Sequence, residues 1–174
     1  VTVDGEKMSK SKGNMIPLRE MPERFCVDAA RFTILNGGES LDDPNWDSTF
    51  ATAFKQKLNG FFDFVLEHYG KGSHEKRLID EWMLSRLHSC VKEGTLFMEE
   101  TLFRSASQEI FFTLQQDVKW YLRRTNNSPN KKVLDEVLDA QLIMLSVFCP
   151  FVCEELWEKL GKKGFVSTAV WPAV

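Results

Sequence analysis

Apolar side chains recur every three or four residues through most of the chain after residue 46, and this pattern restricts the fold more than any other feature. The clearest stretch opens at Asp47 or Ser48 and closes at Gly70; its apolar positions are Phe50, Phe54, Leu58, Phe61, Phe62, Val65 and Tyr69. That spacing places the side chains on one face of an α-helix. A helix of this kind must bury its apolar face, so the segment predicts a helical core.

Further helices follow, separated by polar turns. A short helix with Asp28 as its N-cap is predicted before the first long one, and the later helices are expected at residues 78–94, 98–125, 130–148 and 151–160. Gly94 is the expected end of the second long helix, and Pro150 restarts the chain before the last one. Long helices with short polar links predict an all-α fold, an antiparallel helical bundle, preceded by a short loop and strand segment.

Composition excludes several classes of protein. The chain is 43% hydrophobic, with 14 Phe and 5 Trp, which indicates a folded core and not a disordered tail. No run approaches the ~18 apolar residues of a membrane span, and the N-terminus lacks the apolar stretch of a signal peptide, so we expect a cytoplasmic protein without a membrane partner. The four cysteines and three histidines show no ligand spacing. We therefore expect no metal site, and we expect Cys149 and Cys153 to be core thiols.

One loop near the N-terminus is a candidate for chemistry. Residues 6–14 hold three lysines, two serines and a glycine with little to bury, which predicts an exposed loop. Ammonium groups and backbone N–H donors on one turn can stabilise the negative charge that develops on phosphate oxygens during a displacement at phosphorus. The composition alone is also typical of a solvated loop or a phosphorylation site, so both interpretations stay open at this level.

The string KMSKS at residues 7–11, extended by KGN, resembles the signature loop of the class I aminoacyl-tRNA synthetases. The resemblance implies a loop that closes over ATP, accompanied by Mg²⁺ in the parent enzyme, during amino-acid activation. It implies that Lys10 is the catalytic lysine, which stabilises the departing pyrophosphate, and that Lys7 supports it electrostatically. The residues that it assigns to ATP binding are Lys7, Met8, Ser9, Lys10 and Ser11.

The resemblance extends over essentially the whole chain. Residues 28–35 look like the helix that follows the signature loop in the leucine, isoleucine and valine enzymes. Residues 39–47 (ESLDDPNWD) and 120–124 (WYLRR) look most like leucyl-tRNA synthetases of the archaeal and eukaryotic type, and residues 149–157 resemble the end of their anticodon-binding domain. The resemblance implies two parts: residues 1–46 with the loop and a connecting, stem-contact-like segment, and residues 47–174 with the anticodon-binding bundle.

A basic cluster marks the candidate tRNA-binding surface. In this family the bundle holds the tRNA body, which implies tRNA, specifically tRNA-Leu, as a partner. Lysines and arginines at a helix end suit phosphate contacts, and they are also favoured in the last turn of any helix by the macrodipole, so both interpretations stand. The cluster comprises Lys119, Arg123, Arg124, Lys131 and Lys132.

The chain departs from a complete synthetase in one respect. It contains no His-x-Gly-His element, no nucleotide-binding Rossmann pattern and no editing domain. We therefore expect the C-terminal part of a longer ligase, inactive alone, whose partners include the missing catalytic and editing domains of the same chain. Two alternatives stay open: an isoleucine, valine or methionine enzyme, because the amino-acid pocket lies outside this chain, and a non-catalytic RNA-binding or scaffold protein derived from a synthetase.

Overall fold

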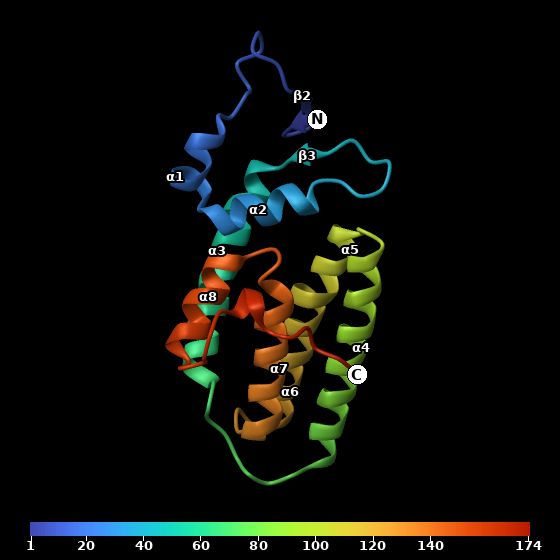
Figure 1. The fold of residues 1–174 in the computed structure, drawn as a ribbon, viewed down its shortest axis with the longest axis vertical. Helices are drawn as coiled ribbons and strands as arrows, with labels where there is room; N and C mark the ends of the chain where they lie inside the picture. The colour runs from blue at the N-terminus through green and yellow to red at the C-terminus, as the bar shows by residue number, and fades with distance from the viewer.

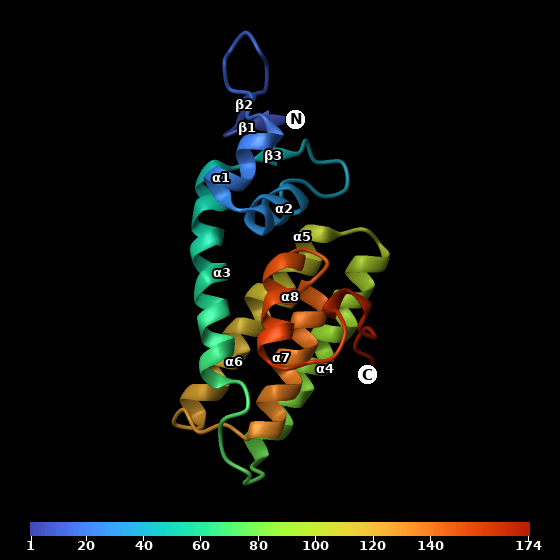
Figure 2. The ribbon, with the colours of Figure 1, turned by 60° about the vertical axis from the view of Figure 1, so that its left-hand side comes forward.

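Helices dominate the computed structural model, which describes residues 1–174 and confirms the predicted all-α bundle (Figure 1). The bundle contains α3 (Ser48–His68), α4 (Leu78–Glu99), α6 (Leu114–Arg124), α7 (Lys131–Leu145) and α8 (Pro150–Lys159). A small three-stranded sheet lies at one end of the molecule, beyond the top of α3 (Figures 1 and 2). None of the helices is long and apolar enough to span a bilayer.

Helix α3 begins where its sequence predicts. The Asp47 carboxylate accepts the backbone N–H of Phe50 at 2.8 Å, which satisfies one of the free donors of the first turn. The helix ends at His68, and its buried positions are Ala51, Phe54, Leu58, Phe61 and Val65. Local capping and apolar spacing agree here, so the prediction from sequence is confirmed.

Helix α4 is longer than predicted. It passes through Gly94 and ends at Glu99, followed by Thr101 in the left-handed region at φ 60°. A Cβ atom on Gly94 would lie 3.1 Å from Cγ1 of Ile110, so the glycine permits close packing of two helices. The prediction of a stop at Gly94 was wrong because the glycine serves a tertiary contact that sequence does not show.

The third predicted helix is divided. It begins at α5 (Phe103–Ser107), widens into the π-helical segment η2 (Gln108–Thr113) and continues as α6. The buried amide of Gln141, on α7, donates to the Ile110 carbonyl at 2.8 Å and gives the widened turn a partner outside the helix. The expected start at residue 98 was wrong because Met98 and Glu99 still belong to α4, and the next helix begins at Phe103.

A buried tyrosine joins three helices of the bundle. The Tyr121 hydroxyl, on α6, donates to the Asp80 carboxylate at the start of α4 and accepts the backbone N–H of Asn130, which caps α7, at 2.9 Å. Burial and the hydrogen bond to Asp80 raise the pKa of Tyr121 well above its ordinary value. The tyrosine therefore stays neutral and works as a structural donor.

The N-terminal residues form the small sheet and two short helices. Strand β1 (Thr2–Val3) pairs antiparallel with β2 (Glu6–Lys7) and parallel with β3 (Asn45–Trp46). Between β2 and β3 the chain passes through η1 (Leu18–Glu20) and α1 (Met21–Phe25) into α2 (Val27–Asn36). Five residues form a small core beneath the sheet, namely Val3, Phe25, Ala30, Trp46 and Ala51.

The sequence predicted that Asp28 caps its own helix, α2. In the structure Asp28 caps α8 instead. Helix α2 begins one residue earlier, at Val27, and the buried Asp28 carboxylate accepts the backbone N–H groups of Val152 at 2.7 Å and Phe151 at 3.3 Å. Those groups lie in the first turn of α8. Burial raises the pKa of Asp28, while the two N–H donors act in the opposite direction. The contact ties the N-terminal segment to the bundle.

Removing this cap is expected to destabilise the fold. Asp28→Ala leaves two N–H groups of α8 without an acceptor and should lower the free energy of unfolding by about 1–2 kcal/mol, measured by urea denaturation. Asp28→Asn keeps an acceptor oxygen and should cost less. An alanine variant as stable as the parent chain would show that the cap contributes nothing.

The predicted core thiols are confirmed. Cys149 and Cys153 are buried and free, and Cys90 is also buried. Burial raises the pKa of Cys90 to about 12 and raises the pKa of Cys149 and Cys153 well above the ordinary thiol value. These side chains remain protonated at neutral pH, so they are packing groups without nucleophilic character.

Candidate functional site

The lysine-rich loop projects from the end of the molecule opposite the tip of the bundle. It leaves β2 and returns towards α1 as a long turn beyond the small sheet (Figure 2). Lys7, Met8 and Lys10 are exposed, and Ser9 is half-buried. The structure therefore brings the whole predicted ATP-binding set, Lys7 to Ser11, together on one accessible turn.

Asn14 closes this loop from within. Its Oδ1 accepts the backbone N–H of Ser9 at 2.9 Å, and its Nδ2 donates to the Lys7 carbonyl at 3.1 Å. Gly13 adopts φ 68°, a conformation that favours glycine, and donates its N–H to the Lys10 carbonyl at 3.2 Å. Hydrogen bonds within the loop therefore define the course of its backbone.

The lysines of the loop are not equivalent. Lys12 pairs with Glu6 at 3.5 Å, whereas neither Lys7 nor Lys10 forms an ion pair. Two exposed ammonium groups without carboxylate partners, three residues apart on one loop, suit a polyphosphate more than an internal structural role.

The sheet anchors the loop to α3. The Asp4 carboxylate accepts the backbone N–H of Ser48 at 2.7 Å and its hydroxyl at 3.0 Å, at the start of α3. Asn45 Oδ1 accepts the Thr2 hydroxyl at 2.7 Å and the Gly5 N–H at 3.0 Å. The sequence did not indicate these contacts, because their partners lie 40 to 44 residues apart along the chain.

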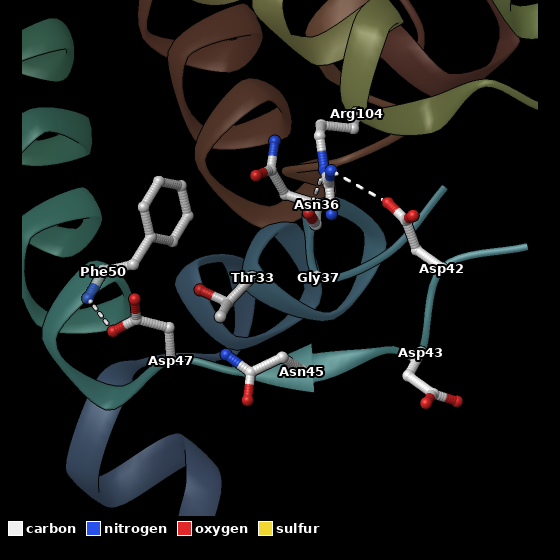
Figure 3. A pocket seen from close by; sticks show the side chains of 9 residues that line it. All are labelled: Thr33, Asn36, Gly37, Asp42, Asp43, Asn45, Asp47, Phe50 and Arg104. Carbon is white, nitrogen blue, oxygen red and sulfur yellow. Dashed lines mark hydrogen bonds and ion pairs between the residues drawn. The ribbon is translucent and has the colours of Figure 1, made fainter. Parts of the chain in front are cut away.

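A polar hollow of about 400 Å³ lies beside β3, between α2, the start of α3 and the segment after α2 (Figure 3). Arg104, from α5, donates to the Asn36 carbonyl at 3.0 Å and to Asp42 at 3.1 Å. The Glu39 carboxylate accepts the backbone N–H and hydroxyl of Ser105 at 3.0 and 2.9 Å. These contacts hold residues 36–42 against the bundle. Arg104 gave no signal in the sequence, because Asp42 lies 62 positions away.

The basic cluster is largely available for contact. Lys119, Arg123 and Arg124 are exposed along α6, and Lys132 is exposed at the start of α7. Lys131 differs because its ammonium group pairs with Asp135 at 2.8 Å.

The end of α6 does not need its arginines as caps. The Thr125 hydroxyl donates to the Tyr121 and Leu122 carbonyls at 3.0 and 3.1 Å. The Arg124 guanidinium instead lies 5.0 Å from the centroid of the Trp120 ring, and that ring packs on Trp82 at 4.2 Å. An arginine held on an aromatic surface presents its donors to solvent.

No group of three or more His, Cys, Asp or Glu side chains in the structure is placed to hold a metal ion.

Comparison with known protein families identifies two matches. Residues 80–174 match the family described as "Anticodon-binding domain of tRNA ligase", and residues 1–62 match "tRNA synthetases class I (M)". The match to residues 1–62 continues past the loop and the sheet into α3, and the match to residues 80–174 covers the chain from the first turn of α4 to its last residue.

Individual relatives cover the chain almost completely. A leucine–tRNA ligase of Aeropyrum pernix is 41% identical over 99% of this chain, and one of Pyrococcus horikoshii is 37% identical over 98%. The chain spans only 18% of the length of each of these relatives. Among solved structures, the LeuRS of Agrobacterium radiobacter K84, in a ternary complex with tRNA and LeuAMS, has the same fold, with a TM-score of 0.82 and 21% identity over 98% of this chain and 23% of that one.

Proposed function

Because this chain belongs to the class I aminoacyl-tRNA synthetases, and carries their anticodon-binding domain, we propose that it serves as the signature-loop and tRNA-binding part of a leucyl-tRNA synthetase. The parent enzyme activates leucine with ATP and transfers it to tRNA-Leu in the cytoplasm. One observation carries this proposal: a turn with two unpaired lysines is anchored to a helical bundle that has its own exposed cations. The whole-chain similarity to leucine enzymes favours leucine over isoleucine, valine and methionine, and gives no support to a non-catalytic scaffold.

In the proposed reaction the loop acts on the phosphates of ATP. Attack of the leucine carboxylate on the α-phosphate releases pyrophosphate, and the Lys10 ammonium group neutralises the charge on that leaving group. Lys7 adds a second positive charge, and the backbone from Met8 to Ser11 contacts the nucleotide. In the parent enzyme Mg²⁺ would accompany the phosphates of ATP. The chain alone has no leucine pocket, so we expect it to be inactive without the other domains.

The bundle is proposed to hold the tRNA through phosphate contacts. Lys119, Arg123 and Arg124 present charges along the second half of α6, and Lys132 does so at the start of α7, where Lys131 pairs with Asp135. Contacts of this kind position an RNA without reading its bases.

Replacing the two arginines is expected to weaken tRNA binding. For the double variant Arg123→Ala and Arg124→Ala, affinity for tRNA should drop at every salt concentration. The slope of log affinity against log salt concentration should become shallower by the equivalent of about two phosphate contacts. Filter binding of a tRNA-Leu transcript to the 174-residue chain, over a range of salt, measures both quantities.

A matched control is available in the same cluster. Lys131→Ala removes a cation that already pairs with Asp135, so it should change binding less than removal of either arginine. Equal binding by the wild-type chain and the double arginine variant would contradict the proposed surface.

A further inference from the structure

Asn14 joins the two arms of the signature loop through its side chain. Its Oδ1 accepts the backbone N–H of Ser9 at 2.9 Å, and its Nδ2 donates to the Lys7 carbonyl at 3.1 Å. Both polar groups of the amide therefore have a backbone partner on the outgoing arm of the loop, which we define as residues 7–9. The returning arm, residues 12–14, carries the amide itself.

Few other contacts join these two arms. The Lys12 N–H donates to Ser9 Oγ at 3.3 Å, which is longer than either hydrogen bond of Asn14. Lys12 also pairs with Glu6 at 3.5 Å, but both of these side chains are more than half exposed, so the ion pair contributes little. The amide of Asn14 is therefore the main connection between the arms.

This connection matters for Lys10 more than for Lys7. Lys7 belongs to β2 and pairs with Thr2 of β1, so the sheet sets its position. Lys10 lies beyond the sheet and follows directly on Ser9, whose N–H group Asn14 holds. The position of the Lys10 backbone relative to the sheet therefore depends on the Asn14 amide.

We propose that Asn14 is a positioning residue for Lys10: its amide holds the loop in the shape in which the Lys10 ammonium group meets the departing pyrophosphate. Asn14 itself does not contact the nucleotide, because both groups of its amide are used inside the loop. A loop that is ordered before the reaction loses less conformational entropy in the transition state, and its charge needs less reorganisation. The inference rests on the proposed function, because it concerns the same reaction of ATP.

Asn14→Ala tests this role in a complete synthetase that carries this chain. Loss of the amide should slow leucine-dependent ATP–pyrophosphate exchange by roughly 10-fold, since displacement of a reacting group by about 1 Å costs up to about 100-fold in rate. The decrease should appear in kcat, with KM for leucine unchanged, because the positioned charge acts in the transition state.

Folding of the variant is measured separately. Residues 8–14 contribute no side chain to either hydrophobic core, so thermal unfolding of the enzyme should be the same with and without the substitution. Asn59→Ala is the matched control, because Asn59 is an exposed asparagine in the middle of α3. This control variant should exchange pyrophosphate at the wild-type rate.

A double variant shows whether Asn14 acts through Lys10. In an enzyme that already carries Lys10→Ala, Asn14→Ala should slow exchange by no more than about 2-fold, because the group that it positions is absent. A residue that only stabilised the fold would lower the rate by the same factor with and without Lys10.

The outcomes separate this inference from the proposed function. Equal exchange rates for the wild-type enzyme and Asn14→Ala would overturn the positioning role and leave the role of Lys10 intact. Losses that multiply in the double variant would also overturn it, because Asn14 would then act independently of Lys10. A Lys10→Ala enzyme as fast as the wild type would reject the proposed reaction itself, and this inference with it.

Discussion

Replacing Lys10 with alanine, in a complete synthetase that carries this chain, should slow formation of leucyl-adenylate by about two orders of magnitude. The expected loss of transition-state stabilisation is on the order of 3 kcal/mol, the effect of removing one preorganised donor from developing negative charge. The structure supports such a role because Lys10 is exposed, forms no ion pair, and lies on a turn closed by Asn14 and Gly13. ATP–pyrophosphate exchange measures the step directly.

Lys12→Ala is the matched control for this experiment. Lys12 lies two residues further along the same loop and already pairs with Glu6, so its removal should change the rate far less. The Lys10 variant should also lower kcat and kcat/KM for leucine by similar factors, because the interaction is made in the transition state. An exchange rate equal to that of the unmodified enzyme would refute the assignment of Lys10.

Phe54→Ala should lower the free energy of unfolding by about 3–5 kcal/mol, the usual effect of replacing a buried phenylalanine with alanine. Phe54 is 1% exposed, and its ring stacks on Phe32 of α2 with centroids 3.7 Å apart. It also meets Phe111 of η2 edge-on at 5.3 Å. The ring therefore fills the point where three elements meet, and its loss leaves a cavity there. Since small domains are stable by only about 5–15 kcal/mol, urea denaturation should show a large shift.

Phe151→Ala is the control for this core variant. Phe151 is 63% exposed on α8, so the same substitution there should change stability by no more than about 0.5 kcal/mol. Equal effects of the two substitutions would mean that the Phe32–Phe54 stack does not hold the N-terminal segment on the bundle.

Several features of the fold and site followed from sequence because they depend on neighbouring residues. The start of α3 required only Asp47 beside an apolar period, and the signature loop required only the string from residue 7 to residue 14. The family resemblance, carried by such strings, is confirmed by relatives that cover nearly the whole chain. The interpretation of Cys149 and Cys153 as core thiols likewise depended on helical spacing alone.

Other features could not be predicted in this way. Gly94 has the same local signal as a helix stop, yet α4 continues through it because Ile110 packs there. The π-helical turn of η2 depends on Gln141, which belongs to another helix. Periodicity describes one helix at a time, so it does not show which residue of a second helix approaches it.

Sequence by itself therefore determined the helical class, the exposed lysine loop and the family, because each depends on residues within a few positions of one another. Tertiary structure alone decided that Asp28 caps α8 and that Arg104 holds the segment after α2. The physical reason is that capping and ion pairing depend on distances in space, and the partners in these two cases lie 124 and 62 residues apart along the chain.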